Sequence, residues 1–320
     1  IVDSYGKNEF LRRISDPLFF QAFSLAVGFD WHSSGTTTVL VGALKEYLKN
    51  RDIGLAIAGG KALAGLKTPE DIEIISKRYD LKNRDKLIYS SKISARVDNN
   101  LIQDGFSIYF HAMIITDEGK WAVVQQGLNY NEKYARRYHW LGENVKEYVN
   151  EPHSGIVSDI SFERVLDLTS SDSEDTRKTT LEIVKDNPLK IKNDIVTIKK
   201  NMLTIDDFTD QRVIKMPWKI NWDVLREIYE FQPKNYEEIV MFKGMGASTI
   251  RALAYIATLI YGSRVSWKDP VKYSFALGGK DGVPRPVDRK AYDESIDFLK
   301  NIIDGLDSQE RKDALRRIMK

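Results

Sequence analysis

The fold of this chain is decided by its most β-rich stretch, Phe106-Ser-Ile-Tyr-Phe-His-Ala-Met-Ile-Ile-Thr-Asp-Glu-Gly-Lys-Trp-Ala-Val-Val-Gln-Gln126. Residues 106–116 and 121–126 are rich in β-branched and aromatic side chains, which favour strands. Asp117-Glu-Gly-Lys120 lies between the two runs and has the composition of a tight turn. The stretch therefore predicts an antiparallel β-hairpin.

Helical patterns precede this β-hairpin. Asp16-Pro17 marks the start of a helix with a broad apolar stripe, and helical spacing resumes from Thr36 to Leu48. Residues 53–58 form a short apolar run of the kind expected for a strand, and residues 90–104 have the pattern of a helix. These elements predict a mixed α/β domain over residues 1–168.

A change in composition follows this domain. Residues 169–180 are rich in Ser, Thr and Asp and contain little that could be buried, which is typical of a flexible loop or linker. Residues 188–200 are Lys-rich and amphipathic. We therefore expect a linker with an amphipathic segment over residues 169–210, and the helical patterns beyond it predict a third region, residues 211–320.

The helical region contains a second informative stretch, Phe242-Lys-Gly-Met-Gly-Ala-Ser-Thr-Ile250, between two apolar helical patterns. Gly244 and Gly246 can adopt positive φ and bring backbone N–H groups close to a phosphate. The following helix would direct its positive N-terminus at the same anion. This pattern predicts a helix-hairpin-helix that binds the DNA backbone with little sequence preference. An ordinary glycine-rich turn between helices is the alternative.

The charge distribution supports contact with DNA. Between Lys243 and Lys290 the chain has nine Lys or Arg against three Asp, although its overall net charge is only +2. The predicted DNA-binding residues are Lys243, Gly244, Gly246, Ser248, Thr249, Arg251, Lys280, Arg289 and Lys290. The fold class is thus α+β: an N-terminal mixed α/β domain with an antiparallel β-hairpin, followed by an all-α helix-hairpin-helix domain.

Composition excludes several classes of protein. The 320 residues include no cysteine, which excludes disulfides, thiolate metal sites and a cysteine nucleophile, and fits a reducing or a hot environment. No apolar run approaches the roughly 18–20 residues that span a bilayer, so we expect no membrane association and a cytoplasmic location. Because the sequence starts at Ile1 without Met or a signal pattern, we expect it to begin inside a longer reading frame.

The stretch at 242–250 resembles the helix-hairpin-helix of the DNA glycosylase superfamily that includes endonuclease III-like enzymes. The resemblance implies a catalytic Asp in a Val-Asp pair, which Val287-Asp288 matches, although farther from the hairpin than in that superfamily. Bifunctional members carry a Lys where this chain has Ser248, which argues against a lyase step. Asp288 could stabilise oxocarbenium character at a sugar, or simply cap the next helix.

Polar residues are dense in the first 160 residues. Lys92 and Arg96 share one side of a helix by their spacing, and we expect His111, on the first strand of the β-hairpin, to share one strand face with Ser107 and Tyr109. We predict catalytic roles for Asp98 and His111, beside Asp288. The predicted pocket residues are Asp30, His32, Lys92, Arg96, Gln125, Gln126, Arg136, Arg137, His139 and His153. Mutual satisfaction of buried polar groups is the alternative. No metal-binding spacing is present, so we predict no cofactor, with a divalent ion left open.

Several longer sequence motifs resemble those of a prokaryotic family named for "domain of unknown function 763". These motifs include Asp16-Pro-Leu-Phe-Phe-Gln21, Ala135-Arg-Arg-Tyr-His-Trp-Leu141, Glu151-Pro-His-Ser-Gly-Ile156 and Tyr273-Ser-Phe-Ala-Leu-Gly-Gly-Lys-Asp-Gly282. The resemblance covers nearly the whole chain and implies that an N-terminal segment is missing. The resemblance implies no particular reaction for this chain.

Three functional hypotheses follow. The first is a DNA-repair enzyme, a monofunctional glycosylase that uses Asp288 and reads an extruded base with aromatic and amide side chains such as Trp31 and Gln125. The second is a metal-dependent nuclease or phosphodiesterase with Asp98 and His111 in the first domain. The third is a non-catalytic DNA-binding protein. DNA is the expected partner in all three, and protein partners stay unknown from the sequence.

Overall fold

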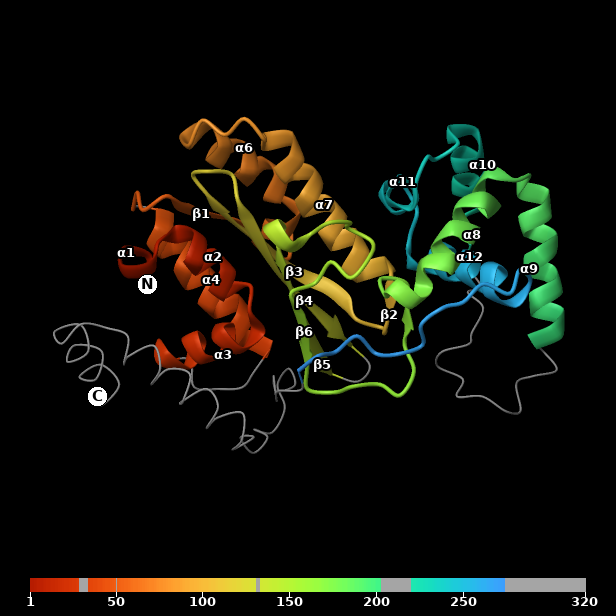
Figure 1. Cartoon of the computed structure of the whole chain (residues 1–320), viewed down its shortest axis with the longest axis horizontal. Coiled ribbons are helices and arrows are strands. Elements are labelled where there is room, and N and C mark those ends of the chain that lie inside the picture. Colours follow the sequence, from red (N-terminus) through yellow and green to blue (C-terminus); the bar gives the residue numbers. More distant parts are fainter. Residues whose placement is uncertain (29–33, 50, 131–132, 203–219, 274–320) are drawn as a thin grey trace.

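A five-stranded antiparallel sheet forms the centre of the first part of the protein (Figure 1). The computed structural model describes residues 1–28, 34–49, 51–130, 133–202 and 220–273. The predicted β-hairpin is confirmed at the centre of this sheet, whose strand order is β1-β3-β4-β5-β6. The strands are β1 (Leu55–Lys61), β3 (Ser107–Thr116), β4 (Trp121–Asn129), β5 (Tyr134–Leu141) and β6 (Gly155–Ser158).

Helices cover both faces of the sheet, so its strands are buried on both sides. Phe110, Ala112 and Ile114 pack against the N-terminal helices, whereas Met113 and Ile115 pack on the opposite face. The N-terminal helices are α1 (Val2–Tyr5), α2 (Lys7–Ile14), α3 (Pro17–Ala26) and α4 (Ser34–Lys49). The opposite face carries α6 (Thr68–Arg78) and α7 (Arg84–Asn100), after the short α5 (Leu63–Leu66).

A β-bulge changes the register near the start of β3. Ile108 pairs with Gly127 and Phe110 with Gln126, so Tyr109 is the extra residue. The bulge moves Ser107 to the sheet face opposite that of His111. The prediction that these two side chains share one face was therefore wrong.

The second part of the protein is helical and packs against α7 (Figure 1). Residues 174–180, predicted as loop or linker, form the first half of α8, which the 3₁₀ helix η2 (Ser171–Ser173) precedes. This prediction was wrong because Thr176 and Thr180 are buried, and the hydroxyl of Thr176 donates to the carbonyl of Arg264. The helices are α8 (Glu174–Lys185), α9 (Pro188–Met202), α10 (Trp222–Phe231), α11 (Tyr236–Met241) and α12 (Ala247–Leu259).

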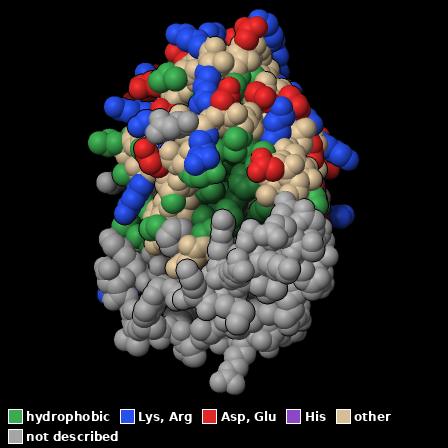
Figure 2. Space-filling model, turned by 90° about the vertical axis from the view of Figure 1, so that its left-hand side faces the viewer, with side chains coloured by type: hydrophobic (Ala, Val, Ile, Leu, Met, Phe, Trp, Pro, Cys, Tyr) green, Lys and Arg blue, Asp and Glu red, His purple; other side chains and the backbone are tan. Residues whose placement is uncertain are grey.

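The two parts meet along α7 and a small second sheet, in which β2 (Ile102–Gln103) pairs with β7 (Leu166–Asp167). The hydroxyl of Tyr89 on α7 donates to the carboxylate of Glu237 on α11 at 2.9 Å. No helix of the described ranges is both long enough and apolar enough to cross a membrane. On the side that carries the N-terminal helices, hydrophobic side chains gather in a hollow bordered by charged ones (Figure 2).

Candidate nucleic-acid interface

A turn lies between α11 and α12, where the glycine pattern predicted one, and one detail of that prediction is corrected. Asn235 caps α11, and α12 begins directly after Gly246. Gly244 has φ +83°, and a Cβ there would lie 2.6 Å from Val224, so only glycine fits. Gly246 has the extended value φ −117° and open space around it. Positive φ is therefore needed at one of the two glycines, not at both.

Backbone donors at the start of α12 are unused. The N–H groups of Gly246, Ala247 and Ser248 have no acceptor among the residues that the structure describes, and no side chain caps this helix. Lys243, Gly244 and Ser248 are exposed, whereas Thr249 is buried. The first turn of α12 thus presents free donors and the positive end of a helix of 13 residues to solvent.

Side chains of the first part hold this turn in place. Arg96 on α7 donates at 2.9 Å to the carbonyls of both Val240 and Phe242, which end α11. Gln103 donates to the carbonyl of Ala247 and accepts a hydrogen bond from Arg251. Arg96 was predicted to line a pocket and Arg251 to bind DNA. Both therefore also position the turn between α11 and α12 relative to the sheet.

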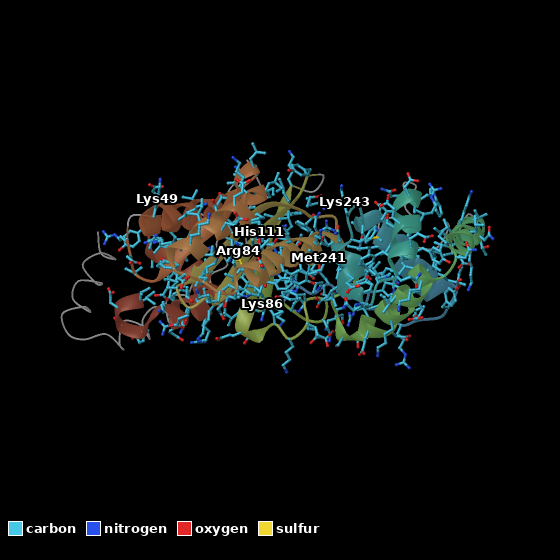
Figure 3. The ribbon with its side chains drawn as sticks, turned by 90° about the horizontal axis from the view of Figure 1, so that it is seen from above. Lys49, Arg84, Lys86, His111, Met241 and Lys243 are labelled. Atoms are coloured by element: carbon cyan, nitrogen blue, oxygen red, sulfur yellow. The ribbon has the colours of Figure 1, made fainter. Side chains whose placement is uncertain are left out.

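A cleft of about 840 Å³ lies beside the turn and is enclosed by α5, α7 and β3, with Met241 at its helical end. Figure 3 shows Met241 and Lys243 at the border of the helical part, on the side nearer to His111. Lys92 and Arg96 line the cleft, which confirms their predicted common side, and His111 reaches its wall. No carboxylate of the described residues lines it. The other lining residues are Ala62, Leu63, Gly65, Leu66, Thr68, Pro69, Ser91, Ala95, Asn99, Asn100, Ile108, Tyr109 and Phe110.

A chain of buried hydrogen bonds runs from this cleft beneath α7. The side-chain amide of Gln125 donates to Asp98, so its oxygen is an acceptor, and Nδ1–H of His111 donates to that oxygen at 2.8 Å. Nε2 of His111 must then accept the proton of Ser91, whose Oγ lies 2.7 Å away. Burial lowers the pKa of His111 to about 4, so the imidazole is neutral near pH 7.

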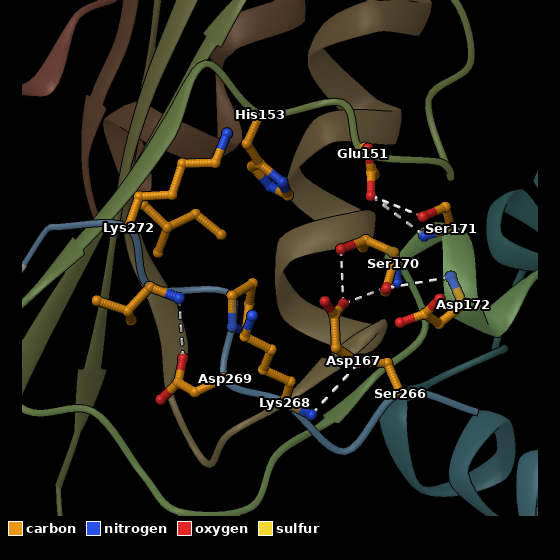
Figure 4. Close-up of a pocket in the computed structure, with 14 residues that line it drawn as sticks. Glu151, His153, Asp167, Ser170, Ser171, Asp172, Ser266, Lys268, Asp269 and Lys272 are labelled. Carbon is orange, nitrogen blue, oxygen red and sulfur yellow. Dashed lines mark hydrogen bonds between the residues drawn. The ribbon is translucent and has the colours of Figure 1, made fainter.

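The same chain continues to a second hollow on the other side of α7. Asp98 has no exposed surface and also accepts hydrogen bonds from Trp140 and from Nε2 of His153. Burial raises the pKa of Asp98, against the effect of these donors. Only 7% of the His153 side chain is exposed, and its ring points into the hollow (Figure 4). The hydrogen-bonded chain Ser91–His111–Gln125–Asp98–His153 therefore connects the two hollows.

The second hollow measures about 400 Å³ and has a different charge from the cleft. Glu151, Asp167, Asp172 and Asp269 line it together with Lys268 and Lys272. Burial raises the pKa of Asp167, although Thr169 donates to it. No group of three or more His, Asp or Glu side chains that could hold a metal ion occurs within the described ranges.

The opposite sheet face holds three of the predicted pocket residues. Arg137 is fully buried, donates to His139 at 2.7 Å and to Thr37 at 3.3 Å, and lies over the Phe20 ring. Burial lowers the pKa of Arg137 to about 9 and the pKa of His139 well below its usual value. Gln126 lies on this face as well. The predicted single pocket is therefore divided between two faces, because neighbouring strand residues alternate.

Arg136 has a distinct environment. Its guanidinium, with no exposed surface, contacts Asp104 at 2.7 Å and Asp269 at 2.8 Å. The rings of Phe106 and Phe162 both lie against this guanidinium, with centroids 4.7 and 5.7 Å from its Cζ and 6.1 Å from each other. Arg136 therefore joins β5 to the segment around residue 269.

Comparison with family models assigns the chain to a family. A model described as "Protein of unknown function (DUF763)" matches residues 1–287. The chain belongs to this family. No curated protein and no solved structure matches it. The match includes the sheet, both hollows and the turn between α11 and α12, and it ends one residue before Asp288.

Some predicted site residues lie outside the described residues. They are Asp30, His32, Lys280, Asp288, Arg289 and Lys290. Ser91, which was not among the predicted site residues, also belongs to the candidate site because it contacts His111 at the cleft. Its position seven residues before Asp98 places both on the same face of one helix, and that spacing is the signal that identifies it.

Proposed function

We propose that this protein is a DNA-binding repair enzyme that holds the phosphate backbone with the turn between α11 and α12. One observation carries the proposal: among the residues that the structure describes, Gly246, Ala247 and Ser248 present unused N–H groups at a helix N-terminus, and the neighbouring cleft has no carboxylate in its lining. Such donors together with the helix dipole make an anion-binding site. Because they contact backbone rather than bases, the expected binding has little sequence preference.

The charge of the hollows supports the cleft as the place where DNA enters. A polyanion is attracted by Lys92 and Arg96 and repelled by carboxylates. The hollow around His153 has four carboxylates against two lysines in its lining, whereas the described lining of the cleft has two cations and no carboxylate. The cleft volume of about 840 Å³ lies within the range of small-ligand sites and can accommodate a nucleotide.

For the reaction we propose removal of a damaged base by a monofunctional glycosylase. An extruded nucleotide would occupy the cleft, since an enzyme must take a base out of the stack to act on it. Asp288 is the carboxylate that the sequence offers for the sugar. Ser248 in place of a lysine remains the argument against a lyase step.

A second candidate reaction, phosphodiester cleavage, is favoured by the Ser91–His111 pair at the cleft wall. A nucleophile beside a base that a third group orients is the arrangement of covalent hydrolases. Oγ of Ser91 would attack phosphorus and form a phosphoserine bond while one strand leaves. His111 would accept the serine proton and return it to the leaving oxygen, after which water would hydrolyse the intermediate.

One assay distinguishes the two reactions. Duplexes that carry uracil, hypoxanthine or an oxidised base are incubated with the protein in EDTA and analysed with and without alkali. We expect alkali-dependent breaks at one lesion, and their loss in Asp288→Asn but not in Ser91→Ala. Breaks that need no alkali and vanish in Ser91→Ala would replace the first reaction by the second. If neither product forms in EDTA, both reactions are wrong. Strand breaks that then appear on addition of Mg²⁺ would indicate a metal-dependent nuclease, and their absence would leave a non-catalytic DNA-binding role.

A further inference from the structure

The short helix α5 carries the two most exposed large hydrophobic side chains of the described residues. Leu63 is 74% exposed and Leu66 is 78% exposed. Their spacing of three residues places them on the same side of the helix. Both belong to the lining of the cleft. This apolar pair is not part of the core and is accessible to a partner.

The backbone around α5 fixes these leucines firmly. The N–H of Ala62 donates to the carbonyl of Tyr109 at 2.8 Å, and Ala62 itself has the unusual value φ +51°. Gly65 lies so close to β1 that a Cβ would be 3.0 Å from the carbonyl oxygen of Gly60. The hydroxyl of Thr68 donates to the carbonyl of Gly65. One side of α5 is therefore packed against the sheet, and the leucines project from the other.

Cations flank the leucine pair. Lys67 directly follows α5, Lys61 lies two residues before it, and both are exposed, while Lys92 on α7 lines the same cleft as the leucines. A DNA duplex is complementary to leucines flanked by lysines, because its stacked bases lie between two rows of phosphates. Proteins that distort DNA insert apolar side chains between base steps and hold the neighbouring phosphates with cations.

We infer that α5 is a wedge: Leu63 and Leu66 enter the base stack of DNA bound at the cleft and fill the space that an extruded nucleotide leaves. The inference rests on the proposed function, because it requires DNA at the turn between α11 and α12. It specifies the substrate as a duplex from which one nucleotide can be turned out. Mismatched or damaged pairs unstack most easily and are the preferred class.

The test uses a duplex with 2-aminopurine in a mismatch, since this base gains fluorescence when it unstacks. The variant is Leu63→Ala/Leu66→Ala, and the matched control is Leu189→Ala, an equally apolar residue on α9 that is 67% exposed. We expect the wild type and the control to raise the fluorescence several-fold at saturation. The double variant should lose most of this increase, while its affinity for an undamaged duplex changes less than about threefold.

The outcomes separate the wedge from DNA binding. Equal fluorescence from the wild type and the double variant, with intact DNA binding, overturns the wedge alone. A wild-type protein that binds no duplex overturns the proposed function and the wedge together. Vesicles with anionic lipid provide the last arm, because two leucines among lysines also suit a lipid surface. Vesicle binding that the double variant loses, without an effect on DNA, overturns the wedge in favour of a membrane contact.

Discussion

Replacing Arg136 with alanine is expected to lower the free energy of unfolding by about 3–5 kcal/mol. The side chain is fully buried between Asp104 and Asp269, and its removal leaves two carboxylates without their cation. Tyr138 also donates to Asp104, and the N–H of Phe162 donates to Asp269, but neither contact supplies a positive charge. The substitution also removes the group that joins β5 to the segment around residue 269.

Urea unfolding followed by circular dichroism measures this loss. Arg226→Ala is the control, because Arg226 pairs with Asp223 on the surface and its side chain is 69% exposed. Exposed ion pairs contribute little, so the control should unfold close to the wild type. A loss below about 1 kcal/mol in Arg136→Ala would show that Arg136 does not organise this part of the protein.

Acid is expected to destabilise the protein through its buried histidines. Burial lowers the pKa of His111 from 6.5 to about 4, so in this pH range the unfolded chain binds a proton that the folded protein does not. The contribution of His111 to the free energy of unfolding is complete above pH 6.5 and is lost as the pH falls toward 4. This contribution amounts to about 3 kcal/mol. His139, whose pKa is lowered further, acts in the same direction.

Two buried carboxyls act in the opposite direction and must be separated from this effect. Burial raises the pKa of Asp98, and raises that of Asp104 to about 6, so each makes the folded protein relatively more stable in acid. The measurement is therefore a difference: the free energy of unfolding of wild type minus that of His111→Gln, at pH 7 and at pH 4.5. We expect the difference to fall by about 2–3 kcal/mol toward acid. A difference that is independent of pH would show that His111 titrates normally.

The sequence predicted the β-hairpin and several helices because their patterns are local. It did not predict β5, because this strand contains Arg136, Arg137 and His139, which normally disfavour burial. Their burial depends on distant partners, among them Asp269 for Arg136 and Phe20 for Arg137. Such pairings across the chain are not visible in a local pattern.

The candidate site was predicted only in part, because local patterns identify residues that share a helix face but not contacts between distant parts of the chain. Helical spacing correctly placed Lys92 and Arg96 on one side of α7, beside the cleft. It could not show that Arg96 also fixes the end of α11, since that contact joins residues 144 positions apart. The alternation along β5 was available in the sequence, but without a recognised strand it could not separate Arg137 and His139 from Asp98 and His111.

The most direct test of DNA binding by the turn between α11 and α12 is the affinity of Gly246→Val for a fluorescent duplex at fixed salt. Gly244 is unsuitable for this test, because a side chain there collides with Val224. A Cβ at position 246 meets no neighbour within 4 Å and valine suits the extended backbone, so the fold should persist. Gly42→Val, at an exposed and equally open position on α4, is the control. We predict at least a tenfold loss of affinity in Gly246→Val and none in Gly42→Val; equal affinity of both folded variants and the wild type would contradict the account.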